Sequence, residues 1–322
     1  MSSATTWGWT RTICTSAGSG ESVTAPILVT GASGFVGSYL VPWLERRGVH
    51  VRAMVRDLAK GRPLAAAGAE LVAGDLLDPA SLTRAVQDVE AIVHLAAVAD
   101  SSDADLNERV NVGGTRALAE AADAAGVLRF INVSSTCAGR GLRDAYGETK
   151  RLAEGVLDAT DLDVTHLRPA MIYGAGSKEW DIFTAVVRRL PLVPLPGTGS
   201  TVLRPVYLDD MLDLVGRVLD RPAAVGRTYD VAGPEPVTTA DLVARTGRAM
   251  GRRRRALTFP ARAAILGARA IGAVMQRPPV NVDQVMAFMQ DTVVDIEPAR
   301  TELGWEPRGL DDGLAALFGG DA

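Results

Sequence analysis

Residues 27–37 read Ile-Leu-Val-Thr-Gly-Ala-Ser-Gly-Phe-Val-Gly, an apolar run of four residues followed by glycines spaced three apart. The apolar run is typical of a buried strand, and the residues from Gly34 onward are typical of a helix that Gly48 ends. Glycines between a strand and a helix let the chain turn tightly and bring backbone N–H groups close to an anion. The stretch therefore predicts a loop that holds the pyrophosphate of a dinucleotide.

Strands and helices are predicted to alternate through the rest of the first half of the chain. Short apolar runs predict strands, and longer alanine-rich or amphipathic stretches predict helices between them. The predicted strands are 49–55, 70–73, 91–96, 129–133 and 164–168, and the predicted helices are 34–47, 109–125 and 146–159. Strands joined by helices form parallel units with right-handed crossovers. We therefore expect an α/β fold built on a doubly wound parallel sheet of the Rossmann type.

The pattern changes after about residue 175. Residues 191–199 are rich in proline and glycine, which predicts a turn-rich connection, and Arg252–Arg255 are expected between elements. Helices are predicted at 209–219 and 239–250. We expect a dinucleotide-binding domain at 25–175 and a smaller C-terminal substrate-binding portion at 176–322. Segments within about 201–231 are expected to return to the first domain.

The composition excludes several classes of protein. The chain has 34 Lys+Arg against 38 Asp+Glu, a net charge of −4, whereas a general nucleic-acid binder should be basic. A hydrophobic content of 47% is ordinary for globular proteins. Cys14 and Cys137 are the only cysteines, and the three histidines are dispersed, so neither a disulfide framework nor a metal site is predicted. The expected partner is a small-molecule substrate.

Signals for targeting and membranes are weak. Residues 1–24 are rich in Ser, Thr and Gly and lack the charged and apolar regions of a secretory signal, so we expect a disordered tail. The most apolar stretch, Ala263–Met275, contains Arg269 and is too short to span a bilayer. We therefore expect a cytoplasmic protein without an integral membrane segment. Contact of Ala263–Met275 with a membrane surface is kept as an alternative.

The end of the second predicted strand should select the cofactor. A carboxylate there accepts hydrogen bonds from the adenosine ribose, whereas an arginine there accommodates a 2′-phosphate. If the strand ends at Val55, Arg56 lies at its carboxyl end and Asp57 one residue beyond. This arrangement favours NADP. NAD is the alternative, because a strand one residue longer would give that place to Asp57.

Tyr146 and Lys150 are four residues apart in a predicted helix, which puts both side chains on one face. An unperturbed tyrosine has a pKa of about 10, and a neighbouring ammonium lowers it by favouring the phenolate. Such a pair predicts the proton donor and acceptor that hydride transfer at a carbonyl or alcohol requires. Taken alone, the spacing also fits a pair of exposed residues on a surface helix.

Several motifs, in chain order, resemble the extended branch of the short-chain dehydrogenase/reductase family, which includes the NAD-dependent epimerase/dehydratase enzymes. The motifs are Thr30-Gly-Ala-Ser-Gly-Phe-Val-Gly37, Gly74-Asp-Leu76, His94-Leu-Ala-Ala97, Asn111-Val-Gly-Gly-Thr115, Val133-Ser-Ser-Thr136, Tyr146-Gly-Glu-Thr-Lys150, Arg168-Pro-Ala-Met-Ile-Tyr-Gly174 and Tyr207-Leu-Asp-Asp210. The resemblance covers about residues 27–211 and weakens beyond them.

The resemblance implies roles for individual residues. Tyr146 would move the proton, Lys150 would lower the tyrosine pKa and hold the nicotinamide ribose, and Thr136, with Ser135 as its competitor, would bind the substrate oxygen. The implied cofactor-binding residues are Gly31, Gly34, Phe35, Val36 and Gly37 at the phosphates, Asp75 and Leu76 at the adenine, Ala96 and Ala97 where the cofactor approaches the sheet, Asn111 in support, and Ser134, Pro169 and Ile172 at the nicotinamide, together with Arg56, Tyr146 and Lys150.

These features favour an NAD(P)-dependent oxidoreductase, with reduction of a carbonyl as the first expectation because Arg56 favours NADPH. Two alternatives stay open, a sugar-nucleotide epimerase that retains its NAD and a non-enzymatic sensor or assembly protein on the same fold. Cys137-Ala138 follow Thr136 in place of the acidic pair that resembles a sugar 4,6-dehydratase, which argues against elimination. Relatives often form homodimers through helices equivalent to 109–125 and 146–159.

Overall fold

The structure, a computed structural model, describes residues 25–99, 103–140, 143, 145–274 and 289–319. The tail expected at residues 1–24 lies outside them. A seven-stranded sheet has the order β11-β6-β5-β4-β1-β2-β3, and every neighbouring pair is parallel. Its strands are β1 Ile27–Thr30, β2 Val51–Val55, β3 Glu70–Ala73, β4 Ala91–His94, β5 Arg129–Val133, β6 Asp163–Pro169 and β11 Thr228–Val231. The doubly wound parallel sheet predicted from the sequence is confirmed.

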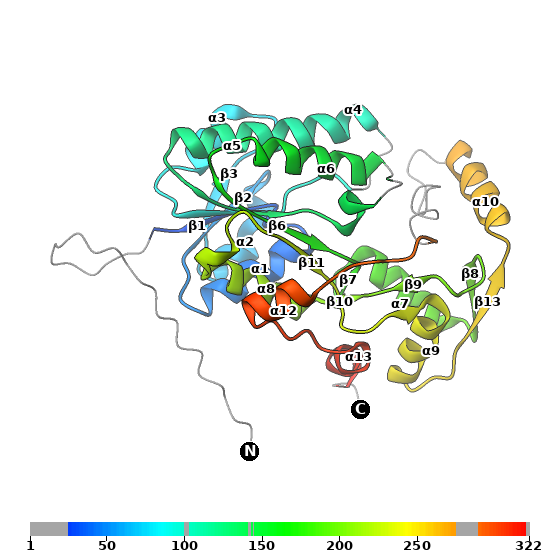
Figure 1. The fold of residues 1–322 in the computed structure, drawn as a ribbon. Helices are drawn as coiled ribbons and strands as arrows, with labels where there is room; N and C mark the ends of the chain where they lie inside the picture. The colour runs from blue at the N-terminus through cyan, green and yellow to red at the C-terminus, as the bar shows by residue number, and fades with distance from the viewer. Residues whose placement is uncertain (1–24, 100–102, 141–142, 144, 275–288, 320–322) are drawn as a thin grey trace, which may run out of the picture.

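Two helical layers cover the sheet (Figure 1). One contains α3 (Pro79–Ala85), α5 (Gly114–Ala124) and α6 (Ala145–Asp158), and the other contains α1 (Phe35–Glu45), α2 (Leu58–Ala66), α8 (Leu208–Leu219) and α12 (Glu297–Leu303). In β1, Leu28 packs into the first layer and Val29 into the second, as the alternation of side chains along a strand requires. The order of strands reverses between β1 and β4, so the loops after these strands separate and leave room for a ligand.

The remaining elements form a smaller group, which lies to the right of the main sheet in Figure 1. Within the residues that the structure describes, it contains three two-stranded pairs and four helices. The pairs are β7 (Ile172–Tyr173) with β10 (Val206–Tyr207), β9 (Val202–Leu203) with β12 (Val237–Thr238), and β8 (Leu192–Pro196) with β13 (Arg255–Phe259). The helices are α7 (Lys178–Arg189), α9 (Thr239–Ala249), α10 (Ala261–Val274) and α13 (Leu310–Phe318). α8 and β11, both from beyond residue 200, pack within the larger group.

Two sequence-based expectations are wrong in detail. Residues 192–196 form the strand β8, not a turn-rich connection, and Arg255 begins its partner β13. Each strand has only one neighbour in this pair, so prolines without an N–H group are tolerated. The predicted helix 109–125 is also interrupted, because residues Glu108–Gly113 form a wider π-helical turn, η1, that follows the short helix α4 (Ala104–Asn107). Within η1, Asn111 bonds to the backbone of Val98, which favours the wider turn.

We predict that Gly313→Ala destabilises the fold, because a Cβ there would lie 1.8 Å from the hydroxyl oxygen of Tyr173. Tyr173 is fully buried, with its ring centroid 5.0 Å from that of Trp180 and 5.4 Å from that of Tyr207, so it has no room to move. Overpacking of this kind costs about 1–3 kcal/mol. The measurement is the free energy of unfolding in urea.

The matched control is Gly155→Ala in α6, where an added Cβ meets nothing within 4 Å. Alanine in a helix is favoured over glycine by about 0.5–1 kcal/mol, so this variant should be slightly more stable than the natural chain. Equal stability of the two variants would contradict the prediction.

Candidate active site

The loop between β1 and α1 is wound so tightly that its glycines cannot be replaced freely. Gly31 has a φ of +66°, and a Cβ at this residue would lie 2.7 Å from the backbone nitrogen of Ala96. A Cβ at Gly37 would lie 2.4 Å from the carbonyl oxygen of Gly31. No side chain caps the first turn of α1, and that turn holds no acidic residue. Its backbone N–H groups, beginning at Phe35 and Val36, therefore suit an anionic group such as a pyrophosphate.

The residue after β2 is Arg56, because the strand ends at Val55 as predicted. Arg56 is exposed and makes no hydrogen bond or ion pair with any residue that the structure describes. Asp57 is already used locally, since its Oδ1 accepts a hydrogen bond of 2.9 Å from the N–H of Ala59 and caps α2. Of the two side chains considered as cofactor selectors, the arginine has the greater freedom to reach a ligand.

Asp75 and Leu76 follow β3 in a turn that is held by hydrogen bonds at Asp75 and by packing of Leu76 against α5. Asp75 Oδ1 accepts a hydrogen bond of 2.9 Å from the N–H of Leu77, and the N–H of Asp75 donates to Ser81 Oγ at 3.0 Å. Leu76 is buried against α5, where a Cβ at Gly114 would come within 2.6 Å of it. This local fixation holds the turn beside the carboxyl ends of β2 and β3.

A chain of hydrogen bonds joins the loop after β4 to the glycine loop through His94. The Thr115 hydroxyl donates to the carbonyl of Asn111 at 2.6 Å, so it must accept from His94 Nε2 at 3.0 Å. His94 Nδ1 then accepts from the Thr30 hydroxyl at 2.7 Å, and Thr30 Oγ1 accepts from the N–H of Ala96 at 3.3 Å. Every group is paired only if His94 is neutral. Burial and the charge of Lys150 lower the pKa of His94 to about 3, which agrees with this assignment.

Asn111 connects the same loop to helix α6. Its Oδ1 accepts from the N–H of Val98 at 2.7 Å, and its Nδ2 donates to the carbonyl of Val98 at 2.9 Å. Nδ2 also donates to Thr149 Oγ1 at 3.0 Å, whose hydroxyl donates to the carbonyl of Tyr146. The supporting position predicted for Asn111 is therefore a bridge between the loop that carries Ala97 and the helix that carries the candidate catalytic pair.

Tyr146 and Lys150 lie in the first part of α6, on the side that faces the end of β5. Lys150 is buried, and its ammonium donates a hydrogen bond of 2.8 Å to the carbonyl of Val133, the last residue of β5. Lys150 Nζ lies 6.0 Å from the centroid of the Tyr146 ring. Burial lowers the pKa of Lys150 to about 8, against the opposing charge of Glu154. The two side chains are therefore close, as their spacing predicted.

Ser134, Ser135 and Thr136 follow β5 directly, at the strand end that Lys150 contacts. Ser134 is buried, and its N–H donates to the carbonyl of Leu167 in β6 at 2.7 Å. Ser135 Oγ accepts from the N–H of Cys137 at 3.1 Å and caps the short 3₁₀ helix η2 (Thr136–Gly139). The Thr136 hydroxyl makes no hydrogen bond within the described part of the chain. Of the two candidate hydroxyls, that of Thr136 is therefore the one with more capacity to bind a substrate oxygen.

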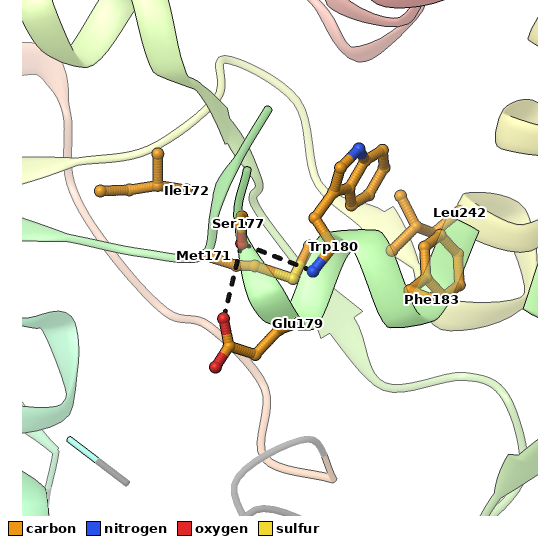
Figure 2. A pocket seen from close by; sticks show the side chains of 7 residues that line it. All are labelled: Met171, Ile172, Ser177, Glu179, Trp180, Phe183 and Leu242. Carbon is orange, nitrogen blue, oxygen red and sulfur yellow. Dashed lines mark hydrogen bonds between the residues drawn. The ribbon is translucent and has the colours of Figure 1, made fainter. Parts of the chain in front are cut away.

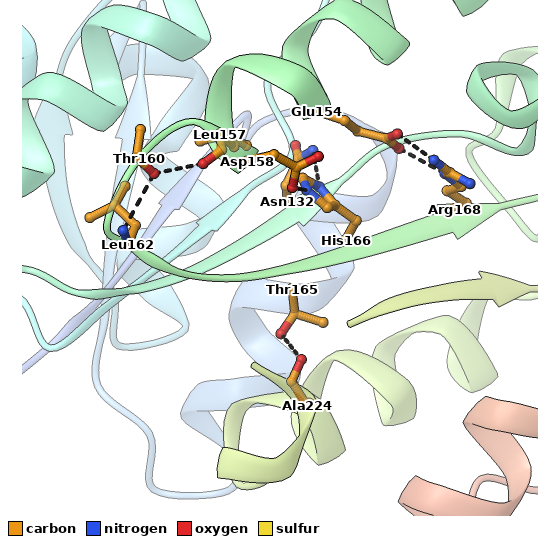
Figure 3. A network of polar contacts seen from close by, with 10 residues as sticks. All are labelled: Asn132, Glu154, Leu157, Asp158, Thr160, Leu162, Thr165, His166, Arg168 and Ala224. Atoms are coloured by element: carbon orange, nitrogen blue, oxygen red, sulfur yellow. Dashed lines mark hydrogen bonds and ion pairs between the residues drawn. The ribbon is translucent and has the colours of Figure 1, made fainter. Parts of the chain in front are cut away.

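The residues that hold α6 against β6 were not predicted from the sequence. Figure 3 shows Arg168 meeting both carboxylate oxygens of Glu154, at 2.9 and 2.6 Å. Burial raises the pKa of Glu154, but the hydrogen bonds and positive charge of Arg168, together with Ser134 and His166, lower it by more, so the net pKa is lowered. His166 lies nearby between Asn132, at 2.9 Å, and Asp158, at 3.0 Å. The available signal was the position of Glu154 four residues after Lys150, on the same helical face.

A cavity of about 340 Å³ lies in the smaller group of elements, next to the end of β6. Its lining is mainly apolar, and Figure 2 shows the side chains of Met171, Ile172, Ser177, Glu179, Trp180, Phe183 and Leu242. Ile172, predicted to bound the nicotinamide, therefore lines this cavity, while Pro169 ends β6 three residues before it. Trp180, Phe183 and Glu179 carried no sequence signal, because side chains that line a cavity follow no fixed pattern in the sequence.

Most of the predicted residues gather at one edge of the sheet. Gly31, Ala96, Ser134 and Pro169 follow or end four adjacent parallel strands, β1, β4, β5 and β6, at their carboxyl ends. Arg56 and Asp75 follow β2 and β3 at the same edge. Tyr146 and Lys150 reach the edge from α6 through the contact with Val133. The edge of a doubly wound sheet where the strand order reverses is the place where such folds bind ligands.

The family of the chain follows from comparison with known proteins. The model of the NAD dependent epimerase/dehydratase family matches residues 27–232, which is more than half of the chain. The chain belongs to this family, and it is an enzyme. The matched residues include the glycine loop, the Tyr146–Lys150 pair and the edge strand β11.

Individual relatives differ in what they act on. The chain is 34% identical over 184 residues to a ceramide reductase of Caulobacter vibrioides, an alignment that covers 57% of each chain. It is 29% identical to a 2-alkyl-3-oxoalkanoate reductase of Stenotrophomonas maltophilia, over 90% of this chain and 98% of the relative. A solved structure of MoeE5 in complex with UDP-glucose and NAD shares the fold, with a TM-score of 0.72, 24% identity, and coverage of 91% and 97% of the two chains.

We predict that His94 makes the fold sensitive to acid. Its pKa is lowered from 6.5 to about 3, so its neutral form stabilises the folded state above pH 6.5, and this stability is lost as the pH falls toward 3. Lowering the pH from 7 to 5 should remove about 2 kcal/mol through this group. In a His94→Gln variant, whose stability is lower throughout, urea unfolding should show a pH dependence smaller by that amount. An unchanged pH dependence would show that His94 is not held neutral.

Proposed function

We propose that the chain is an NADPH-dependent reductase that acts on the carbonyl of a small molecule with an apolar body. The observation that carries the proposal is the buried Lys150 beside Tyr146, at the sheet edge that also holds the glycine loop. The bound nicotinamide supplies the hydride for the reaction. The residues of the chain hold the cofactor, orient the substrate oxygen and deliver the proton.

The cofactor would be held mainly by backbone. The uncapped first turn of α1 would face the pyrophosphate, and Gly31, which has no room for a Cβ beside Ala96, would let the cofactor come close to the sheet. Asp75 and Leu76 would bound the adenine. Arg56 would pair with a 2′-phosphate, which is the reason for preferring NADPH, and Asp57 is occupied by its cap on α2.

Tyr146 would give its phenolic proton to the substrate oxygen as the carbonyl is reduced. The ammonium of Lys150 favours the phenolate that remains, and the carbonyl of Val133 holds that ammonium in place. The Thr136 hydroxyl would donate to the same substrate oxygen and fix the carbonyl in the plane that the reaction requires. Ser134 would bound the nicotinamide from the end of β5.

The cavity beside Ile172 supports an apolar substrate. Met171, Trp180, Phe183 and Leu242 supply most of its lining, and its charged side chain is the carboxylate of Glu179. A diphosphate would be repelled by this carboxylate and would find no arginine or lysine in the lining. The names of the two reductases reported above describe substrates with alkyl chains, which agrees with this lining. Sugar-nucleotide epimerisation is the alternative, favoured by the name of the family.

We predict that the chain binds NADPH more tightly than NADH and that Arg56→Ala removes the difference. A charged hydrogen bond to a phosphate contributes about 1.5–3 kcal/mol, so the loss should be roughly 10- to 100-fold for NADPH, with NADH unaffected. Nicotinamide fluorescence on titration measures both constants. Arg84→Ala, an exposed arginine in α3, serves as the control and should change neither. Tighter binding of NADH by the natural chain would overturn the preference for NADPH.

We also predict that Tyr146→Phe lowers kcat for the reduction of long-chain ketones by about 10²- to 10⁴-fold, the usual size of acid–base catalysis, because the proton donor is lost. The Kd for NADPH should stay unchanged. The measurement is NADPH oxidation with a series of 2-alkanones, for which kcat/KM should rise with chain length as the tail fills the cavity. Turnover of UDP-glucose to UDP-galactose without added cofactor would assign the site to epimerisation instead.

A further inference from the structure

The positive charge of the chain is concentrated in the smaller group of elements. Residues 182–208 and 242–274 contain eleven arginines and no aspartate or glutamate. The whole chain has a net charge of −4, so the remaining residues carry −15. This separation of charge gives the basic part of the molecule a positive potential that attracts an anionic surface. The acidic remainder of the molecule is repelled by the same surface. The two basic segments include β8 and β13, the β8/β13 ribbon.

The outward face of the β8/β13 ribbon is apolar. Leu192 pairs with Arg255, and Pro194 pairs with Leu257, so these four side chains lie on one face. Leu192 is 49% exposed and Leu257 is 52% exposed, while the opposite face packs Val193 and other apolar side chains against α7 and α9. The exposed leucines of the ribbon therefore do not belong to the hydrophobic core on its other face. They belong to the face of the ribbon that is turned away from α7 and α9.

The apolar face continues along the chain in both directions. Leu190, two residues before β8, is 41% exposed, and Leu266, in the helix that follows β13, is 69% exposed. In Figure 1, β8, β13 and α10 form the side of the smaller group that is farthest from β1, β2 and β3. Exposed leucines gathered on one ribbon and the adjoining helix are unusual for a surface that contacts only water.

Arginines that lack partners lie at both ends of the ribbon. Arg188, Arg189, Arg253, Arg255 and Arg262 are exposed, and their side chains make no hydrogen bond or ion pair with any described residue. Arg254, by contrast, donates to the carbonyls of Val187 and Arg188 and holds the start of β13 against the end of α7. The ribbon is thus fixed in place, and its free guanidinium groups are available to a partner.

We propose that the β8/β13 ribbon and the start of α10 dock on the surface of an anionic lipid bilayer. Leucines 192, 257 and 266 would enter the boundary between headgroups and acyl chains, while the free arginines would pair with lipid phosphates. The exposed leucines and the free arginines together indicate a bilayer as the partner. Arginines alone would suit any polyanion, and a nucleic acid offers no apolar layer for exposed leucines.

The test is cosedimentation of the full chain with lipid vesicles. Vesicles of equal parts phosphatidylcholine and phosphatidylglycerol should carry the protein down at low salt, whereas vesicles of phosphatidylcholine alone should bind it much more weakly. Each arginine near an anionic surface contributes about fivefold to the partition coefficient, so Arg253→Glu/Arg255→Glu should lower it at least about 25-fold. Leu192→Ser/Leu257→Ser should lower it severalfold on the same vesicles.

Matched controls lie far from the ribbon. Leu128→Ser removes a leucine that is 52% exposed, like Leu257, and Arg221→Glu reverses an exposed arginine at the end of α8. Both should sediment like the natural chain. Urea unfolding and NADPH binding should be unchanged in all four variants, which shows that they are folded.

Three results would overturn the proposal. The first is failure of the natural chain to sediment with the anionic vesicles. The second is loss of binding in the arginine variant but not in the leucine variant, which would assign the surface to polyanions in general. The third is a dimer in sedimentation velocity that Leu192→Ser/Leu257→Ser converts to a monomer, which would assign the apolar face to a second copy of the chain.

Discussion

The site depends on the close approach of two loops, the glycine loop after β1 and the loop after β4. Their backbones pass so near each other that a Cβ at Gly31 would lie 2.7 Å from the nitrogen of Ala96. The two loops are held together by a chain of hydrogen bonds that runs from Ala96 through Thr30 and His94 to Thr115. Protonation of His94 at Nδ1 would set that N–H against the Thr30 hydroxyl, which already donates to this nitrogen, so the interior of the protein keeps the imidazole neutral.

Helix α6 is placed by three separate polar contacts, each to a different neighbour. Lys150 bonds to the end of β5, Glu154 pairs with Arg168 of β6, and Thr149 receives the amide of Asn111. Buried charges are costly without partners, and here the lysine has a backbone carbonyl and the glutamate has a guanidinium. The position of Tyr146 therefore does not rest on the exposed start of the helix, where fraying would loosen it.

Motifs tied to backbone geometry could be predicted from the sequence, and features made by distant side chains could not. Gly31, Gly34 and Gly37 are required by a local turn, and the spacing of Tyr146 and Lys150 is a property of a single helix, so each leaves a local signal. The pairing of Glu154 with Arg168 and the cavity formed by Met171, Trp180 and Leu242 join separate segments. The strand β8 was missed for a related reason, because its prolines argue against a strand unless the single partner β13 is known.

The path of the chain between its two groups of elements limits how the protein can be divided. The strand β11 comes after the first elements of the smaller group, yet it completes the main sheet beside β6. A fragment that stopped near residue 175 would contain every candidate catalytic residue but would expose the edge of β6 from His166 to Pro169, where β11 pairs with it. Unpaired edges of this kind invite pairing with other chains. The larger group of elements is thus a unit in space and not in sequence, so a single continuous segment of the chain cannot supply it.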